Sequence, residues 1–143
     1  MKPEDKQLLL KDLCARLPYG IIGAVPHYGE AGEEVLLQGK ITSFNGGRIK
    51  FEYLPDCTDD IGAYNWVDID LVKPYLRPMS SMTEEEEKEY NLLANRCMCT
   101  AVGFIHLEAE SLLDWLNKKM FDFRGLIDKD LALSTETFNP YKD

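Results

Sequence analysis

Cysteine and histidine are the residue types in this chain best suited to bind a metal ion. Cys97 and Cys99 lie close together, and with Cys57 and His106 they supply the four soft ligands that a tetrahedral zinc site needs. A Cys-x-Cys pair on a helix points to opposite sides, however, and the chain has no Cys-x-x-Cys pair. We therefore predict reduced thiols, no metal and no other cofactor.

A second group of residues could act as general bases or bind a hard cation. These residues fall in or near predicted loops at strand ends, and they are His27, Glu30, Asp56, Asp59 and Asp60. No base and nucleophile occur at a motif spacing, and no Asp-x-Asp-x-Asp-Gly loop is present. No catalytic residue is assigned, and a small hydrolase that uses His27 and the loop carboxylates stays an alternative.

Aromatic side chains gather in the middle of the sequence, where they could form a platform for a peptide or a nucleobase. They are Phe44, Phe51, Tyr53, Tyr64 and Trp66. Base stacking is disfavoured because so little basic charge lies beside them. We expect core packing, with a groove for a protein partner as the functional alternative.

The balance of charge excludes several classes of function. The 143 residues include 16 Lys and Arg against 25 Asp and Glu, a net charge of -9 that opposes binding to nucleic acid or to an anionic membrane. No apolar stretch approaches the roughly 20 residues that span a bilayer, and the first residues are too acidic for a secretory signal. The sequence predicts a cytoplasmic protein. An acidic inhibitor that mimics nucleic acid is a further alternative, which requires carboxylates along one face.

Hydrophobic periodicity predicts the elements of the first half of the chain. A leucine stripe predicts a helix over residues 3–17, ended by Pro18 and Gly20. Two-residue alternation over residues 20–73 predicts a small curled antiparallel sheet, which could close into a barrel. Within it, Asn45-Gly46-Gly47 predicts a tight hairpin. The last strand is predicted over residues 66–71, with Val67, Ile69 and Leu71 on one face.

The second half is predicted to be helical. The two prolines of residues 73–78 predict an extended surface connector, because proline cannot donate to a central strand. A capping box of Thr83 and Glu86 opens a helix that runs to about Cys97. Another helix is predicted to start at Ser111. Its inward side chains are expected to be Leu112, Leu113, Leu116 and Met120.

These elements make one α+β domain over residues 1–143. Residues 1–78 hold the N-terminal helix and the sheet, and residues 79–143 hold the helical part. We expect the N-terminal helix and the C-terminal helices to pack on the sheet.

Two segments resemble motifs of uncharacterised small proteins from gut Bacteroidales and their phages and mobile elements. Residues 72–86 (VKPYLRPMSSMTEEE) carry the first motif. Residues 114–117 (DWLN) and 121–129 (FDFRGLIDK) carry the second, although Asp130 stands where those proteins have a glycine. The resemblance implies no activity, and it suggests a prophage or mobile-element origin.

The motifs single out five candidate residues for an interaction or for structure: Tyr75, Arg77, Trp115, Asp122 and Arg124. We predict that Asp122 and Arg124 are structural, because they follow a helix end among apolar neighbours. Their charges could offset each other or satisfy the last carbonyls of that helix. The leading functional hypothesis is a non-enzymatic module that binds another protein, whose identity stays open together with the oligomeric state.

Overall fold

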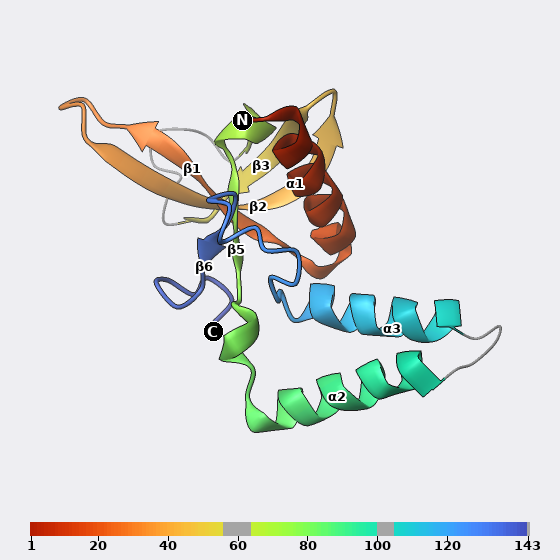
Figure 1. Cartoon of the computed structure of the whole chain (residues 1–143). Helices are drawn as coiled ribbons and strands as arrows, with labels where there is room; N and C mark the ends of the chain where they lie inside the picture. Colours follow the sequence, from red (N-terminus) through yellow and green to blue (C-terminus); the bar gives the residue numbers. More distant parts are fainter. Residues whose placement is uncertain (56–63, 100–104, 143) are drawn as a thin grey trace.

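The protein is an α+β fold built from one open sheet and three helices. The computed structural model describes residues 1–55, 64–99 and 105–142. Helix α1 (Pro3–Arg16) packs beside the sheet, and helices α2 (Glu84–Cys99) and α3 (Ile105–Lys118) run side by side below it (Figure 1). The predicted fold class is confirmed.

The sheet has six strands in the spatial order β4-β3-β2-β1-β5-β6. The strands are β1 (Ile22–Tyr28), β2 (Glu34–Asn45), β3 (Arg48–Tyr53), β4 (Tyr64–Asp68), β5 (Lys73–Leu76) and β6 (Leu133–Ser134). All neighbours are antiparallel except β5 and β6, which are parallel. Because β4 and β6 end the sheet without pairing to each other, the barrel alternative is wrong.

The predicted hairpin between β2 and β3 is confirmed. Asn45 pairs with Arg48, so Gly46 and Gly47 form a two-residue turn. Their φ angles are +57° and +85°, which glycine adopts without the steric penalty of a Cβ atom.

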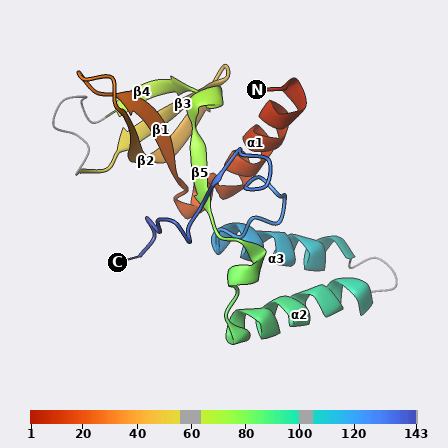
Figure 2. The same ribbon diagram turned by 60° about the vertical axis from the view of Figure 1, so that its left-hand side comes forward.

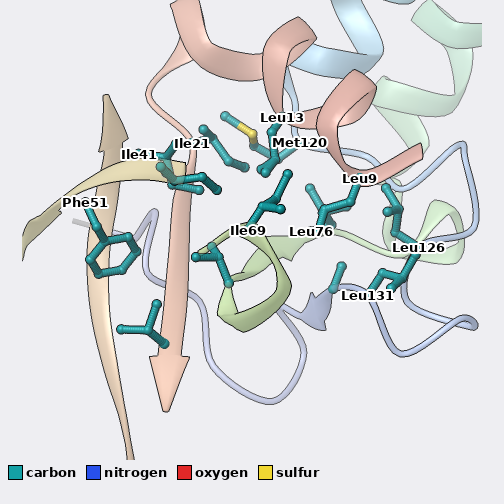
Figure 3. Close-up of a cluster of buried hydrophobic side chains, with 14 of the residues drawn as sticks. Leu9, Leu13, Ile21, Ile41, Phe51, Ile69, Leu76, Met120, Leu126 and Leu131 are labelled. Carbon is teal, nitrogen blue, oxygen red and sulfur yellow. The ribbon is translucent and has the colours of Figure 1, made fainter. Parts of the chain in front are cut away.

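The hydrophobic core lies between α1 and the sheet. Leu9 and Leu13 from α1 are fully buried, and they belong to one cluster with Ile21, Ile41 and Ile69 (Figure 3). The leucine stripe of the helix is therefore covered by the sheet, as its periodicity predicts. This burial is the main force that holds α1 in place.

The segment after β4 differs from prediction. Lys73–Leu76 is not a surface connector but strand β5, in which Pro74, Tyr75 and Leu76 are buried. The proline is tolerated because β5 pairs with β1 only through Gly23 and Ala24, so one missing donor costs little. A partner from the end of the chain, β6, then encloses the strand on its other side.

Three further details correct the predicted elements. The strand predicted over residues 66–71 ends at Asp68, and a short 3-10 turn (Ile69–Leu71) follows, so Ile69 is buried whereas Leu71 is exposed. Helix α3 begins at Ile105, before Ser111. Leu113 does not face inward, since 42% of it is exposed.

Helices α2 and α3 pack on each other in a hairpin that extends away from the sheet (Figure 2), so the expectation that the C-terminal helices pack on the sheet is wrong. The capping box is confirmed: the Glu86 amide donates to the Thr83 hydroxyl, and the Thr83 amide donates to the Glu86 carboxylate, both at 3.2 Å. Within the part of the chain that the structure describes, no helix is long and apolar enough to cross a membrane.

Candidate functional site

Arg77, from the first motif, anchors the start of α2. Its guanidinium donates a 2.8 Å hydrogen bond to each oxygen of the Glu86 carboxylate and a 3.2 Å hydrogen bond to the Ser81 carbonyl. It also lies over the Phe121 ring, with 4.2 Å between Cζ and the ring centroid. The hydrogen bonds from Arg77 lower the pKa of Glu86 from 4.5 to about 2. Arg77 therefore stabilises the fold through its contacts with Glu86 and Phe121.

Trp115 and Tyr75 are equally engaged. The Trp115 indole stacks on Phe121 with 5.6 Å between ring centroids, and its N–H donates to the Glu89 carboxylate at 2.7 Å. Tyr75 is buried, and its hydroxyl accepts a 3.5 Å hydrogen bond from the Gln38 amide. The contacts of Trp115 join α3 to α2 and to the segment that follows α3, whereas the contact of Tyr75 lies within the sheet.

Asp122 and Arg124 have structural contacts, although not with each other. The Asp122 carboxylate accepts hydrogen bonds of 2.8 Å from the amides of Leu126 and Ile127. Arg124 donates to the Asp12 carboxylate at 2.7 Å and to the Asn117 side chain at 3.2 Å. The predicted mutual pairing and the capping of helix carbonyls are therefore wrong, because each charged group has a more specific partner.

Sequence reasoning missed the buried pair at the end of α1. Arg16 donates to both carboxylate oxygens of Asp12, at 2.8 and 2.9 Å, and to the Phe121 carbonyl at 2.7 Å. Both side chains are fully buried, and Nη1 of Arg16 has no hydrogen-bond partner among the described residues. Opposite charges four residues apart, beside the core leucines Leu9 and Leu13, were the available signal.

The residues predicted as general bases are not brought together by the described structure. His27 and Glu30 are exposed at the end of the β1–β2 hairpin, and none of the hollows reported below contains His27. Asp56, Asp59 and Asp60 lie outside the described residues. The hydrolase alternative gains no support from this arrangement.

The four residues weighed as zinc ligands, and not favoured as such, all have side chains outside what the structure describes. Cys57 lies outside the described residues, and the side chains of Cys97, Cys99 and His106 are also outside what the structure describes. Among the described residues, no three His, Cys, Asp or Glu side chains gather at one point. Absence of metal stays a prediction.

Some carboxylates are already engaged with partners inside the protein. Beyond the residues above, the acidic partners of basic side chains are Asp5, Asp68, Asp70 and Asp130. A nucleic-acid mimic needs free carboxylates along one face, and these pairs involve only six of the 25 acidic residues, so that alternative stays untested.

The predicted aromatic platform is divided between the core and the surface. Phe51 and Tyr53 are buried and meet edge to face, with 5.1 Å between ring centroids. Phe44 is partly buried against the same core, Trp66 is exposed, and the side chain of Tyr64 is outside what the structure describes. Core packing is confirmed for Phe51 and Tyr53.

An apolar groove lies on the side of the sheet opposite to the core. Register places it there: Val25 of β1 is in the core, whereas its neighbours Ala24 and Pro26 point the other way, opposite Gln38 and Leu36 of β2. Two adjoining hollows of about 260 and 280 Å³ share Leu36 and Leu133 as lining residues. Together they make the groove, whose other apolar lining residues are Leu71, Tyr75 and Phe138.

The groove leaves large apolar side chains in contact with solvent. Leu36, Leu71 and Phe138 are 42%, 48% and 47% exposed. They come from three distant parts of the sequence, so no local pattern could have predicted that they share one surface.

One end of the groove is acidic. Glu34 lines it and forms no salt bridge to a described residue, while Glu30 and Glu33 lie in the adjoining hairpin loop. No Lys or Arg occurs between Arg16 and Lys40, so the β1–β2 hairpin has no positive charge over residues 17–39 to compensate these glutamates. The basic residue that does line the groove, Lys73, is 2.6 Å from Asp130.

Comparisons of the chain with models of protein families, with curated proteins and with solved structures gave no match.

Proposed function

We propose that the protein is a non-enzymatic interaction module that binds an extended segment of a partner protein in the apolar groove. The observation that carries this proposal is the set of exposed apolar side chains, Leu36, Leu71 and Phe138, that line two adjoining hollows. Isolated exposed leucines are ordinary, whereas apolar side chains gathered along a groove are typical of binding surfaces.

The pairing of β1 favours an extended ligand. Strand β5 pairs with β1 only at Gly23 and Ala24, so the rest of β1 pairs with β2 alone among the described strands. The odd-numbered backbone groups of this segment pair with β2, so beyond Ala24 the free edge offers the Pro26 carbonyl and the backbone N–H and carbonyl of Tyr28 to an added strand. Alternate side chains of such a strand would enter the groove.

Charge defines the second feature of the partner. Three glutamates of the β1–β2 hairpin lie near one end of the groove: Glu30, Glu33 and Glu34. They favour a partner segment that carries Lys or Arg next to its apolar side chains. The net charge of -9 adds long-range attraction for a basic partner.

Selection from a random peptide library on the immobilised full-length chain tests the proposal. We expect recovered peptides with apolar side chains two positions apart and a Lys or Arg at one end. The double variant Leu36→Ser, Leu71→Ser should bind them at least about tenfold more weakly, since each change removes apolar contact area.

The matched control is the double variant Leu92→Ser, Leu113→Ser, which alters two exposed leucines on the helices. It should bind the selected peptides as the parent does. Peptides without the apolar and basic pattern, or equal binding by the groove variant and the parent, would contradict the proposal.

The biological setting is part of the proposal. The two motifs and their resemblance to proteins of phages and mobile elements support a prophage or mobile-element origin. The exposed Cys14 forms no disulfide with another residue that the structure describes, as expected in a reducing, cytoplasmic environment. Fractionation of the native host, with detection of the protein by antibody, would test the location.

A further inference from the structure

A second hollow, distinct from the apolar groove, lies between the end of α3 and the C-terminal tail. It has a volume of about 390 Å³, and its lining residues are Tyr19, Arg77, Lys118, Lys119, Met120, Asn139 and Tyr141. Three of these residues are cationic and none is acidic. In a chain of net charge -9, such a local excess of positive charge is unexpected.

The turn that ends α3 gives this hollow its two lysines. The Phe121 amide donates to the Leu116 carbonyl and the Met120 amide donates to the Asn117 carbonyl, while Met120 has a φ of +61°. This arrangement closes the helix and places the Met120 side chain in the core. The carbonyls of Leu116 and Asn117 thus have backbone partners and do not require the lysine ammonium groups.

The two lysines have no carboxylate of their own. Neither Lys118 nor Lys119 forms a salt bridge with a residue that the structure describes. Arg77 differs, because both of its terminal nitrogens bind the Glu86 carboxylate. The charge available to a ligand is therefore that of two flexible ammonium groups.

Neutral donors complete the lining. The Tyr19 hydroxyl and the amide nitrogen of Asn139 have no hydrogen-bond partner among the described residues, whereas Oδ1 of Asn139 accepts from the Tyr141 amide at 3.0 Å. The Tyr141 hydroxyl accepts a 3.1 Å hydrogen bond from the Ile22 amide, and its single proton can be donated to the Tyr75 carbonyl at 3.0 Å or to the Ile22 carbonyl at 3.3 Å. Tyr141 thus forms a fixed wall of the hollow.

Buried charges of both signs lie near Tyr141. Arg16 and Arg124 share the carboxylate of Asp12. Burial is the main reason that the pKa of Tyr141 is raised, and the charges of Arg16 and Asp12 act on that pKa in opposite directions. The positive charge that an anion would meet in the hollow is therefore that of Lys118 and Lys119.

We propose that this hollow binds the phosphoryl group of a small phosphorylated molecule or free phosphate. Two point-like ammonium charges match a phosphate, which carries close to two negative charges at pH 7. A carboxylate prefers the planar fork of an arginine, and the only arginine lining the hollow already holds Glu86. Lys118 and Lys119 bind the phosphoryl oxygens, and Tyr19 and Asn139 donate to the remaining ones.

Titration of the full-length, isotope-labelled protein with inorganic phosphate, at constant ionic strength, tests the site by nuclear magnetic resonance. We expect saturable shifts of the amide signals of residues 118–120, Asn139 and Tyr141, with half-saturation at or below about 1 mM. Absence of saturable shifts at these residues would overturn the proposal.

Two double variants separate a local site from a general effect of charge. Lys118→Gln, Lys119→Gln should weaken phosphate binding at least about tenfold. The control Lys11→Gln, Lys88→Gln makes the same change in net charge at exposed positions that do not line the hollow. Binding by the control should stay within about twofold of the parent; equal weakening by both variants would overturn the site.

Further titrations identify the source of the phosphoryl group. Tighter binding of phenyl phosphate than of inorganic phosphate would support a phosphorylated organic molecule, and equal or weaker binding would support free phosphate. Acetate at the same concentration should produce no saturable shift, because it carries a single charge. Acetate binding as tight as that of phosphate would overturn the assignment to a phosphoryl group.

Discussion

Asp12 binds two arginines that lie far apart in the sequence. Arg16 contacts it from the same helix at 2.8 Å, and Arg124 contacts it at 2.7 Å from a turn near the end of the chain. The carboxylate is fully buried, so water cannot replace either contact. Asp12 therefore connects the N-terminal helix to the C-terminal segment.

Removal of Asp12 should be strongly destabilising. We expect Asp12→Ala to lower the free energy of unfolding by about 3 to 5 kcal/mol, because it leaves the buried Arg16 without its counter-charge. Urea denaturation measures the change. Asp68→Ala, which breaks an exposed pair with Arg48, is the control and should cost less than about 1 kcal/mol. Similar losses in both variants would contradict a buried network.

Arg124 should contribute stability through the same carboxylate. Arg124→Ala should lower the free energy of unfolding by about 1.5 to 3 kcal/mol, as expected for loss of charged hydrogen bonds. Arg124→Lys should recover less than half of that loss, because an ammonium group cannot reproduce the planar contact with the Phe123 ring. Denaturation midpoints unchanged in both variants would instead assign Arg124 to a binding surface.

The Asp122 carboxylate should stabilise the turn that follows it. Asp122→Ala leaves the amides of Leu126 and Ile127 without their acceptor, at a cost of about 2 to 3 kcal/mol. Asp122→Asn keeps one acceptor oxygen and should lose about half as much. Thermal or urea unfolding measures the loss of unfolding free energy in each variant. Equal losses would show that the negative charge of Asp122, and not the number of its acceptor oxygens, stabilises the turn.

The Arg77–Glu86 pair should make stability depend on pH in the acidic range. The pKa of Glu86 falls from 4.5 to about 2 on folding, so its contribution is complete above pH 4.5 and is lost as pH falls toward 2. That contribution should be about 1 to 2 kcal/mol, since the pair borders on solvent. The measurement is the difference in unfolding free energy between the parent and Glu86→Gln, taken at several pH values. A difference that stays constant from pH 5 to pH 2 would contradict the pair's role.

The local sequence determined those elements whose sequence patterns are formed by residues close together in the chain. The leucine stripe of α1, the Gly46-Gly47 turn and the Thr83–Glu86 capping box were all predictable, because each depends on backbone preferences and contacts of near neighbours. The motif residues Arg77, Asp122 and Arg124 could also be singled out, although their partners could not.

Tertiary structure alone decided how distant segments meet. Pro74 argued locally against a strand, yet a short pairing with β1 and a parallel partner from the chain end make β5 part of the sheet. The apolar groove needs side chains from β1, β2, the Ile69–Leu71 turn, β5, β6 and the tail, and the hollow at the end of α3 needs both Tyr19 and Lys118. A sequence pattern records which side chains a segment offers, whereas burial and charge pairing between segments depend on which of them fold together.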